Sequence, residues 1–93
     1  MSEYVTVETE ATADPDVLEI VTNQRLTEAE QEIYPDYASG NVGSPIAQLL
    51  FVGVPGIEAL TITHDSLLIT RQPDTPWEEI VDEVRDALRD FFL

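Results

Sequence analysis

The C-terminal segment of this chain predicts an amphipathic helix, which limits what the rest can fold into. Thr75 offers an N-cap hydroxyl, Pro76 suits the first helical position, and Glu78 stands at the capping-box position. The large apolar residues that follow recur at steps of three and four: Trp77, Ile80, Val81, Val84, Leu88 and Phe91. A helix with one such stripe must bury it against another layer, so we expect this helix to pack on a sheet.

Four short segments have the composition of β-strands. Tyr4–Glu10 alternates polar and apolar residues, and Val17–Val21 is a short apolar run. The turn residues between them, Pro15 among them, predict a hairpin with a longer loop. Leu60–Thr63 and Leu67–Thr70 predict a second hairpin, whose tip carries the single histidine of the chain.

A second, shorter helix is predicted to start at Ser44. The Ser44 hydroxyl can cap the helix, Pro45 suits the first helical position, and Gly53 is placed to end it. Its apolar residues, Ile46, Leu49, Leu50, Phe51 and Val52, indicate a largely buried helix. The preceding segment, Thr22–Gly43, contains several helix and strand breakers, and we expect a short edge strand or a turn of helix there, followed by loop.

The order of these elements, β-β-α-β-β-α, predicts an α+β fold. We expect an antiparallel sheet of about four strands with two helices packed on one face. The chain of 93 residues is long enough for one hydrophobic core and too short for two. We therefore predict a single domain spanning residues 1–93.

The composition excludes several kinds of function. Cysteine is absent, so these residues form no disulfide, no thiolate zinc site and no cysteine-ligated iron–sulfur cluster. Four Lys and Arg residues against 19 Asp and Glu give a formal net charge of −15, which repels nucleic acids and anionic membranes. The chain has neither a signal peptide nor an apolar run that could span a membrane, and we expect a cytoplasmic protein.

The acidity itself has two explanations at this point. Adaptation to high salt replaces lysine with carboxylates over a whole surface, whereas a nucleic-acid mimic presents carboxylates to a basic protein. The last helix sets like charges four residues apart, as in Glu78 with Asp82 and Glu79 with Glu83. Each such pair costs a few tenths of a kcal/mol at low salt and less when ions screen it. The halophilic explanation therefore predicts a domain that is more stable in molar salt.

Several collinear stretches resemble the cysteine-free N-terminal domain of Nfu/NifU-type iron–sulfur cluster carriers. Glu10–Leu18 (Glu-Ala-Thr-Ala-Asp-Pro-Asp-Val-Leu) is similar to that family's Glu-x-Thr-Pro-Asn-Pro-x-x-Leu signature. Ser44–Phe51 (Ser-Pro-Ile-Ala-Gln-Leu-Leu-Phe) is similar to its Ser-Pro-Leu-Ala-x-x-Leu-Phe helix. Thr63–Thr70 occupies the place of the family's Gly-x-Asp-Phe-Ile-Thr-Val-Thr hairpin, and Trp77 opens the terminal helix as the family's tryptophan does. The chain departs from the signature at Ala13, which together with the following aspartate replaces Pro-Asn.

The resemblance implies a non-enzymatic accessory role in iron–sulfur cluster assembly or delivery. In full-length Nfu proteins a second domain holds the cluster with a Cys-x-x-Cys motif, which these residues lack. The implied partners are iron–sulfur apo-proteins or assembly factors, including a separate Cys-x-x-Cys carrier, and no cofactor is implied. The alternative from another class is an acidic nucleic-acid mimic or inhibitor of a basic protein.

Six residues are candidates for partner binding: Thr12, Asp14, Pro15, Ser44, Pro45 and Asp65. The first three lie in a turn that could hold polar groups ready for a partner, and hairpin geometry alone also explains them. Ser44 and Pro45 equally serve as a helix start. We predict no catalytic residue and no metal ligand, because a lone histidine at a hairpin tip is ordinarily solvated and the carboxylates near Asp14 match no standard calcium loop.

Overall fold

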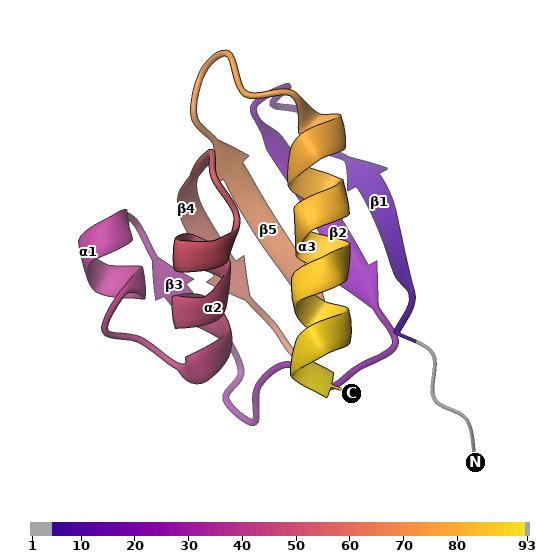
Figure 1. Ribbon diagram of the computed structural model, residues 1–93, viewed down its shortest axis with the longest axis vertical. Coiled ribbons are helices and arrows are strands. Elements are labelled where there is room, and N and C mark those ends of the chain that lie inside the picture. Colours follow the sequence, from indigo (N-terminus) through magenta and orange to yellow (C-terminus); the bar gives the residue numbers. More distant parts are fainter. Residues whose placement is uncertain (1–4, 93) are drawn as a thin grey trace.

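Helices cover one face of a five-stranded antiparallel sheet (Figure 1). The computed structural model describes residues 5–92. Its elements are β1 (Val7–Ala11), β2 (Val17–Thr22), β3 (Glu32–Tyr34), α1 (Tyr37–Gly40), α2 (Pro45–Gly53), β4 (Ile57–Ile62), β5 (Ser66–Arg71) and α3 (Trp77–Phe92). The predicted α+β class and element order are confirmed, with β3 and α1 added between the first hairpin and α2.

The strands lie in the order β1-β2-β5-β4-β3. The two predicted hairpins pair as β1 with β2 and β4 with β5, and β2 joins them by pairing with β5. The fifth strand, β3, pairs with β4 through only three residues, which are too few to show alternation in the sequence. β1 begins at Val7, and Tyr4 of the predicted first strand lies outside the described residues.

The core lies between the sheet and the helices. Its fully buried large side chains come from the strands (Ile20, Leu60, Ile62, Leu67 and Ile69), from α2 and the residue after it (Leu50 and Val54), and from α3 (Ile80, Val84 and Leu88). On β2, on β5 and on β4 from Leu60 onward, the buried residues alternate with residues that face away from the helices. The opposite face of the sheet carries no helix (Figure 1).

The two predicted helices form, with differences in which side chains they bury. The Ser44 hydroxyl caps α2 as expected, but Val52 is 65% exposed because it lies on the outer side of that helix. The apolar stripe of α3 follows four-residue steps from Ile80 and ends at Phe92, which packs on the core. The prediction that Phe91 belongs to the buried stripe is therefore wrong, and its side chain is 43% exposed.

The short helix α1 lies against α2 because a glycine allows it. A Cβ on Gly40 would be 2.1 Å from Cδ2 of Phe51, so only glycine fits there without a shift of the ring. Tyr37 also packs edge-on against the Phe51 ring, with centroids 6.0 Å apart. Asp36 caps α1 by accepting a hydrogen bond from the Ser39 N–H at 2.9 Å.

Candidate protein-binding surface

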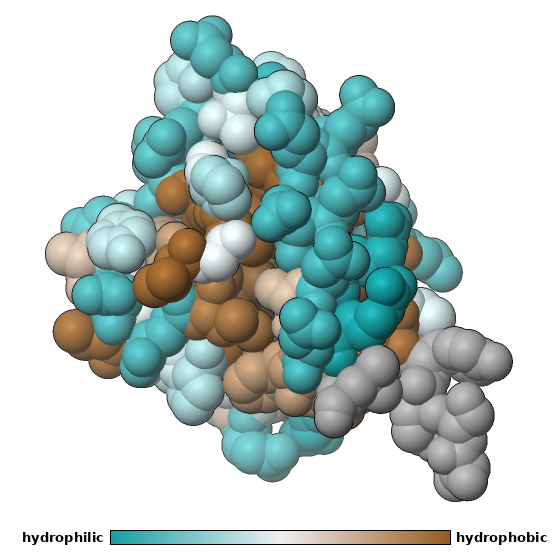
Figure 2. Space-filling model, in the orientation of Figure 1, coloured by the Kyte–Doolittle hydropathy of each residue, from teal (hydrophilic) through white to brown (hydrophobic). Residues whose placement is uncertain are grey.

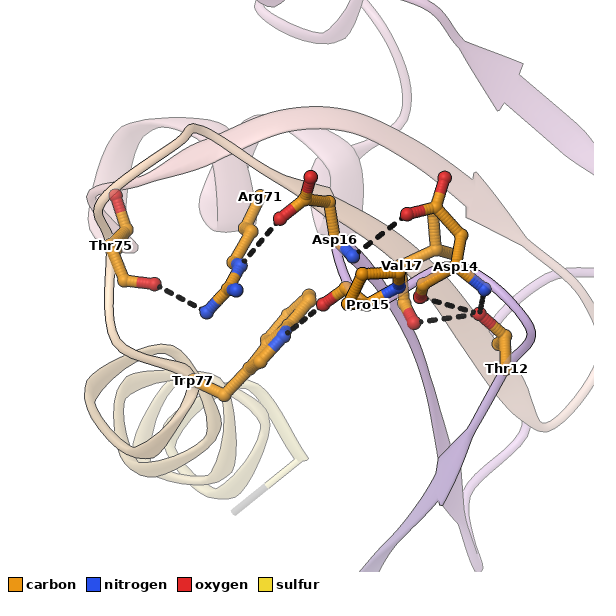
Figure 3. A network of polar contacts seen from close by, with 8 residues as sticks. All are labelled: Thr12, Asp14, Pro15, Asp16, Val17, Arg71, Thr75 and Trp77. Atoms are coloured by element: carbon orange, nitrogen blue, oxygen red, sulfur yellow. Dashed lines mark hydrogen bonds and ion pairs between the residues drawn. The ribbon is translucent and has the colours of Figure 1, made fainter.

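The β1–β2 turn holds its polar side chains in place through bonds within the turn (Figure 3). The Thr12 hydroxyl accepts a hydrogen bond from the Asp14 N–H at 3.1 Å, and it lies 2.8 Å from the Val17 carbonyl, to which it donates. The Asp14 carboxylate accepts from the Asp16 N–H at 2.9 Å. The side chains of Thr12 and Asp14, both predicted binding residues, therefore stabilise the turn through bonds to its backbone, as Thr and Asp commonly do in turns.

Polar contacts join the same turn to the start of α3. The Trp77 indole N–H donates to the Pro15 carbonyl at 3.0 Å across 62 residues of sequence. Arg71 forms an ion pair with the Asp16 carboxylate at 3.1 Å and donates a hydrogen bond to the Thr75 carbonyl at 3.0 Å. Its guanidinium also lies over the Trp77 ring, with Cζ 5.2 Å from the ring centroid. Trp77, predicted as a core residue, is half-buried and serves as the anchor of this turn (Figure 3).

Ser44 joins a second polar cluster, next to the edge strand β3. Its hydroxyl accepts from the Ala47 N–H at 3.3 Å, and its backbone N–H donates to the Tyr34 hydroxyl at 3.1 Å. Partial burial raises the pKa of Glu32, but hydrogen bonds from Ser44, Thr27 and Tyr34 outweigh it, so the pKa lies below the ordinary value of 4.5. The ring of Pro45 beside this cluster is exposed.

Asp65 lies at the other end of the central strands from the β1–β2 turn. Its carbonyl accepts from the Thr22 N–H at 2.8 Å, at the last residue of β2, whereas Asp16 immediately precedes β2. A strand of six residues separates the two ends by about 17–20 Å. The side chain of Asp65 is exposed at this hairpin. The structure therefore brings Thr12, Asp14 and Pro15 together in one turn and does not gather all six predicted residues into one site.

An exposed apolar surface lies on α1, α2 and the connection between them, and we call Tyr37, Val42 and Val52 the α1–α2 surface. Their side chains are 52%, 79% and 65% exposed. None of the three was predicted as a binding residue. The exposure of Val52 could have been predicted from the sequence. Val52 follows the buried Phe51 by one residue, which is a rotation of about 100° around the helix and turns its side chain away from the core.

The outward face of α3 is acidic. Its exposed carboxylates are Glu78, Glu79, Asp82, Glu83, Asp86 and Asp90. Two arginines on the same helix offset part of this charge. Arg85 forms an ion pair with Asp82 at 3.1 Å, and Arg89 forms one with Asp86 at 3.7 Å. Figure 2 shows hydrophilic side chains along α3 and hydrophobic ones gathered toward α2. A partner that meets both elements would need apolar and basic groups side by side.

Other kinds of site find little support among residues 5–92. No three histidine, aspartate or glutamate side chains in this part of the chain are grouped so that they could hold a metal ion. None of the described helices has the length and apolar character needed to cross a membrane. The fold and its surfaces thus define a small α+β domain that offers loops and an apolar face to its surroundings.

Two solved structures of other proteins have a similar fold. The solution structure of a NifU-like protein from Saccharomyces cerevisiae is similar over 94% of this chain and 77% of that one, with a TM-score of 0.76 and 22% identity. The crystal structure of protein SAV1430 from Staphylococcus aureus is similar over 92% of this chain and 99% of that one, with a TM-score of 0.65 and 15% identity. No curated protein sequence matches this chain.

The sequence itself shows the family. Residues 7–93 match the family described as the N terminal of the scaffold protein Nfu/NifU. The chain therefore belongs to the Nfu/NifU N-terminal domain family, as its motifs suggested. This is an iron–sulfur scaffold family and not a known catalytic one, and these 93 residues contain no cysteine with which to bind a cluster.

Proposed function

We propose that this domain is a non-enzymatic accessory module of iron–sulfur cluster assembly or delivery that binds apo-proteins or assembly factors, among them a separate Cys-x-x-Cys carrier. The observation that carries the proposal is the α1–α2 surface. In a family associated with iron–sulfur scaffolds, a domain of net charge −15 leaves Tyr37, Val42 and Val52 exposed to water. Exposed apolar side chains on neighbouring elements of a charged protein are typical of interaction sites.

The physical chemistry of this surface favours protein binding over charge mimicry. Burial of apolar area is roughly independent of salt, and it contributes about 25 cal/mol for each Å² removed from water. The carboxylates of α3 would add attraction to basic partners and repel acidic ones, which affects association rate and partner choice more than affinity. Binding led by the apolar surface should therefore persist when salt screens the carboxylates.

The anchored β1–β2 turn supports the same proposal. Thr12, Asp14 and Pro15 are held by bonds to each other, to β2 and to Trp77, so docking on this turn would cost little conformational entropy. A binding role for these three residues, and for Ser44, Pro45 and Asp65, stays a prediction.

Affinity capture from a lysate of the source organism in molar KCl tests the proposal. We expect the immobilised domain to enrich iron–sulfur proteins or their assembly factors, identified by quantitative mass spectrometry. Val52→Glu should reduce that enrichment, whereas Ala29→Glu makes the same change of charge at an exposed residue outside the α1–α2 surface and should leave it unchanged. Enrichment only of basic nucleic-acid-binding proteins, released by further salt, would instead support the acidic mimic.

A further inference from the structure

The sheet has two edges, and they differ in how well they are protected from pairing with another strand. At one edge, β3 has three residues and is followed by Pro35. At the other edge, β1 has five residues and contains no proline, lysine or arginine. Short edge strands, prolines and charged side chains are the usual devices that prevent edge pairing. β1 relies on charge alone, from Glu8 and Glu10.

The hydrogen-bonding pattern shows which groups of β1 point outward. On β2, the Thr22 N–H donates toward the β5 side, to Asp65, so the alternating residues Val21 and Glu19 turn their backbone groups toward β1. Their partners Glu8 and Glu10 are therefore paired within the sheet. Among residues 5–92, the backbone groups left facing outward from β1 belong to the alternate residues Val7, Thr9 and Ala11.

The side chains at the β1 edge determine which charge an incoming strand should carry. Glu10 lies directly opposite Glu19 on β2, and Glu8, two residues along the strand, shares the helix-free face with them. Like charges directly opposite each other are destabilising. Each of the four arginines pairs elsewhere, with Glu28, Asp16, Asp82 and Asp86. Within the described chain, no cation therefore neutralises these three carboxylates.

Pairing between two copies of β1 is unfavourable for the same reason. An antiparallel pair centred on Thr9 would set Glu8 of each copy opposite Glu10 of the other. Both cross-strand pairs would then be repulsive, at about 0.2–1 kcal/mol each. A strand with basic side chains at those positions would make both pairs attractive.

We propose that the outer edge of β1 binds an extended basic peptide segment of a partner protein, with lysine or arginine at every second residue, as a sixth strand of the sheet. The inference rests on the proposed function, since it names one kind of segment that a protein-binding domain would take. The outward backbone groups of Val7, Thr9 and Ala11 bond the incoming strand. Its cations lie beside Glu8 and Glu10.

An NMR titration at low salt tests this inference on the full chain. The probe is a capped heptapeptide, Thr-Lys-Val-Lys-Val-Lys-Thr, and the control probe, Lys-Val-Thr-Lys-Thr-Val-Lys, has the same composition with its lysines three residues apart. We expect shift changes concentrated on the amides of Val7, Thr9 and Ala11, and slower exchange of those amides with deuterium. The control peptide should bind at least about threefold more weakly, because it cannot set a lysine opposite both glutamates at once.

Two protein variants separate backbone pairing from general charge attraction. E8K/E10K should weaken binding by about tenfold or more, because two attractive cross-strand pairs become repulsive. E83K/D90K changes the net charge equally on α3 and should weaken it much less. T9P keeps the net charge and removes the Thr9 N–H, which faces outward. Edge strands tolerate proline at such a position, so the fold should survive. The affinity for the peptide should fall about fivefold or more, because one hydrogen bond to the peptide is lost.

Equal losses in E8K/E10K and E83K/D90K, or an unchanged affinity in T9P, would overturn the inference in favour of non-specific attraction. Shift changes from dimer formation, without a response to the peptide, would also overturn it. The proposed function fails separately. If capture of iron–sulfur proteins depends on Val52 while the peptide does not bind β1, the domain binds proteins and only this edge site is refuted.

Discussion

Replacement of Trp77 by phenylalanine tests how far one indole N–H stabilises the β1–β2 turn. The substitution removes the bond to the Pro15 carbonyl and keeps an aromatic ring beside Arg71. Because Pro15 is exposed, its carbonyl can bond to water in the variant, and no buried group is left unpaired. The expected loss is therefore the net value of one hydrogen bond, with a small part of the cation–π contact.

The magnitude follows from those two contributions. A hydrogen bond contributes about 0.5–1.5 kcal/mol net to folding. An exposed cation–π contact contributes about 0.5–1 kcal/mol, most of which phenylalanine retains. We expect the free energy of unfolding to fall by about 1 kcal/mol, which lowers the melting temperature of a domain of this size by roughly 4–8 °C. Trp77→Ala also loses the half-buried ring and should cost about 2 kcal/mol or more.

Urea unfolding followed by circular dichroism measures the global effect, since the variants lack the single tryptophan. Amide hydrogen exchange measures the local one: exchange at Asp14 and Asp16 should quicken by about fivefold, the factor that corresponds to 1 kcal/mol. Phe91→Leu, at an exposed aromatic residue of the same helix, should change stability by less than about 0.5 kcal/mol. A Trp77→Phe variant as stable as the parent, with unchanged exchange in the turn, would refute the anchoring role.

Three further predictions concern stability. The melting temperature should rise between low and molar KCl as ions screen the like charges on α3 and β1, and a flat profile would exclude the halophilic explanation. Gly40→Ala should destabilise by about 1–3 kcal/mol because its Cβ would meet the Phe51 ring, whereas Gly53→Ala, with no atom within 4 Å of its Cβ, should fold with no such loss. The lowered pKa of Glu32 contributes stability above the ordinary value of 4.5 that is lost as pH falls through the folded pKa. Glu32→Gln should therefore lose less stability than the parent between pH 5 and acidic pH, and parallel curves in urea titrations would contradict this.

Local sequence signals were sufficient for most of the fold. The Ser44-Pro45 start placed α2, and the Thr75-Pro76 start placed the beginning of α3 within a residue of its observed first residue, Trp77. The third strand and α1 are too short to carry a periodic signal, so only their approximate presence was predicted. The predicted apolar stripe of α3 was wrong at Phe91. Steps of three and of four residues both keep side chains on one helix face, and only packing against neighbouring elements decides which residues are buried.

The candidate site was less accessible to sequence reasoning. The turn at Thr12, Asp14 and Pro15 was recognised from local chemistry, because Thr and Asp bond to backbone groups a few residues away. Its link to Trp77 depends on a contact across 62 residues, and no local pattern encodes such a partner. Outward backbone groups on β1 likewise depend on strand order, which the sequence left open.

The most direct test of the proposed function is a titration of the domain with a purified iron–sulfur apo-protein recovered by capture, monitored by NMR in molar KCl. We predict saturable binding with shift changes on the α1–α2 surface, and a loss of affinity of about tenfold in Val52→Glu, because a charge would replace an apolar contact. Binding that disappears in molar KCl, and that Val52→Glu leaves unchanged at low salt, would contradict the account and identify charge attraction as the basis of recognition.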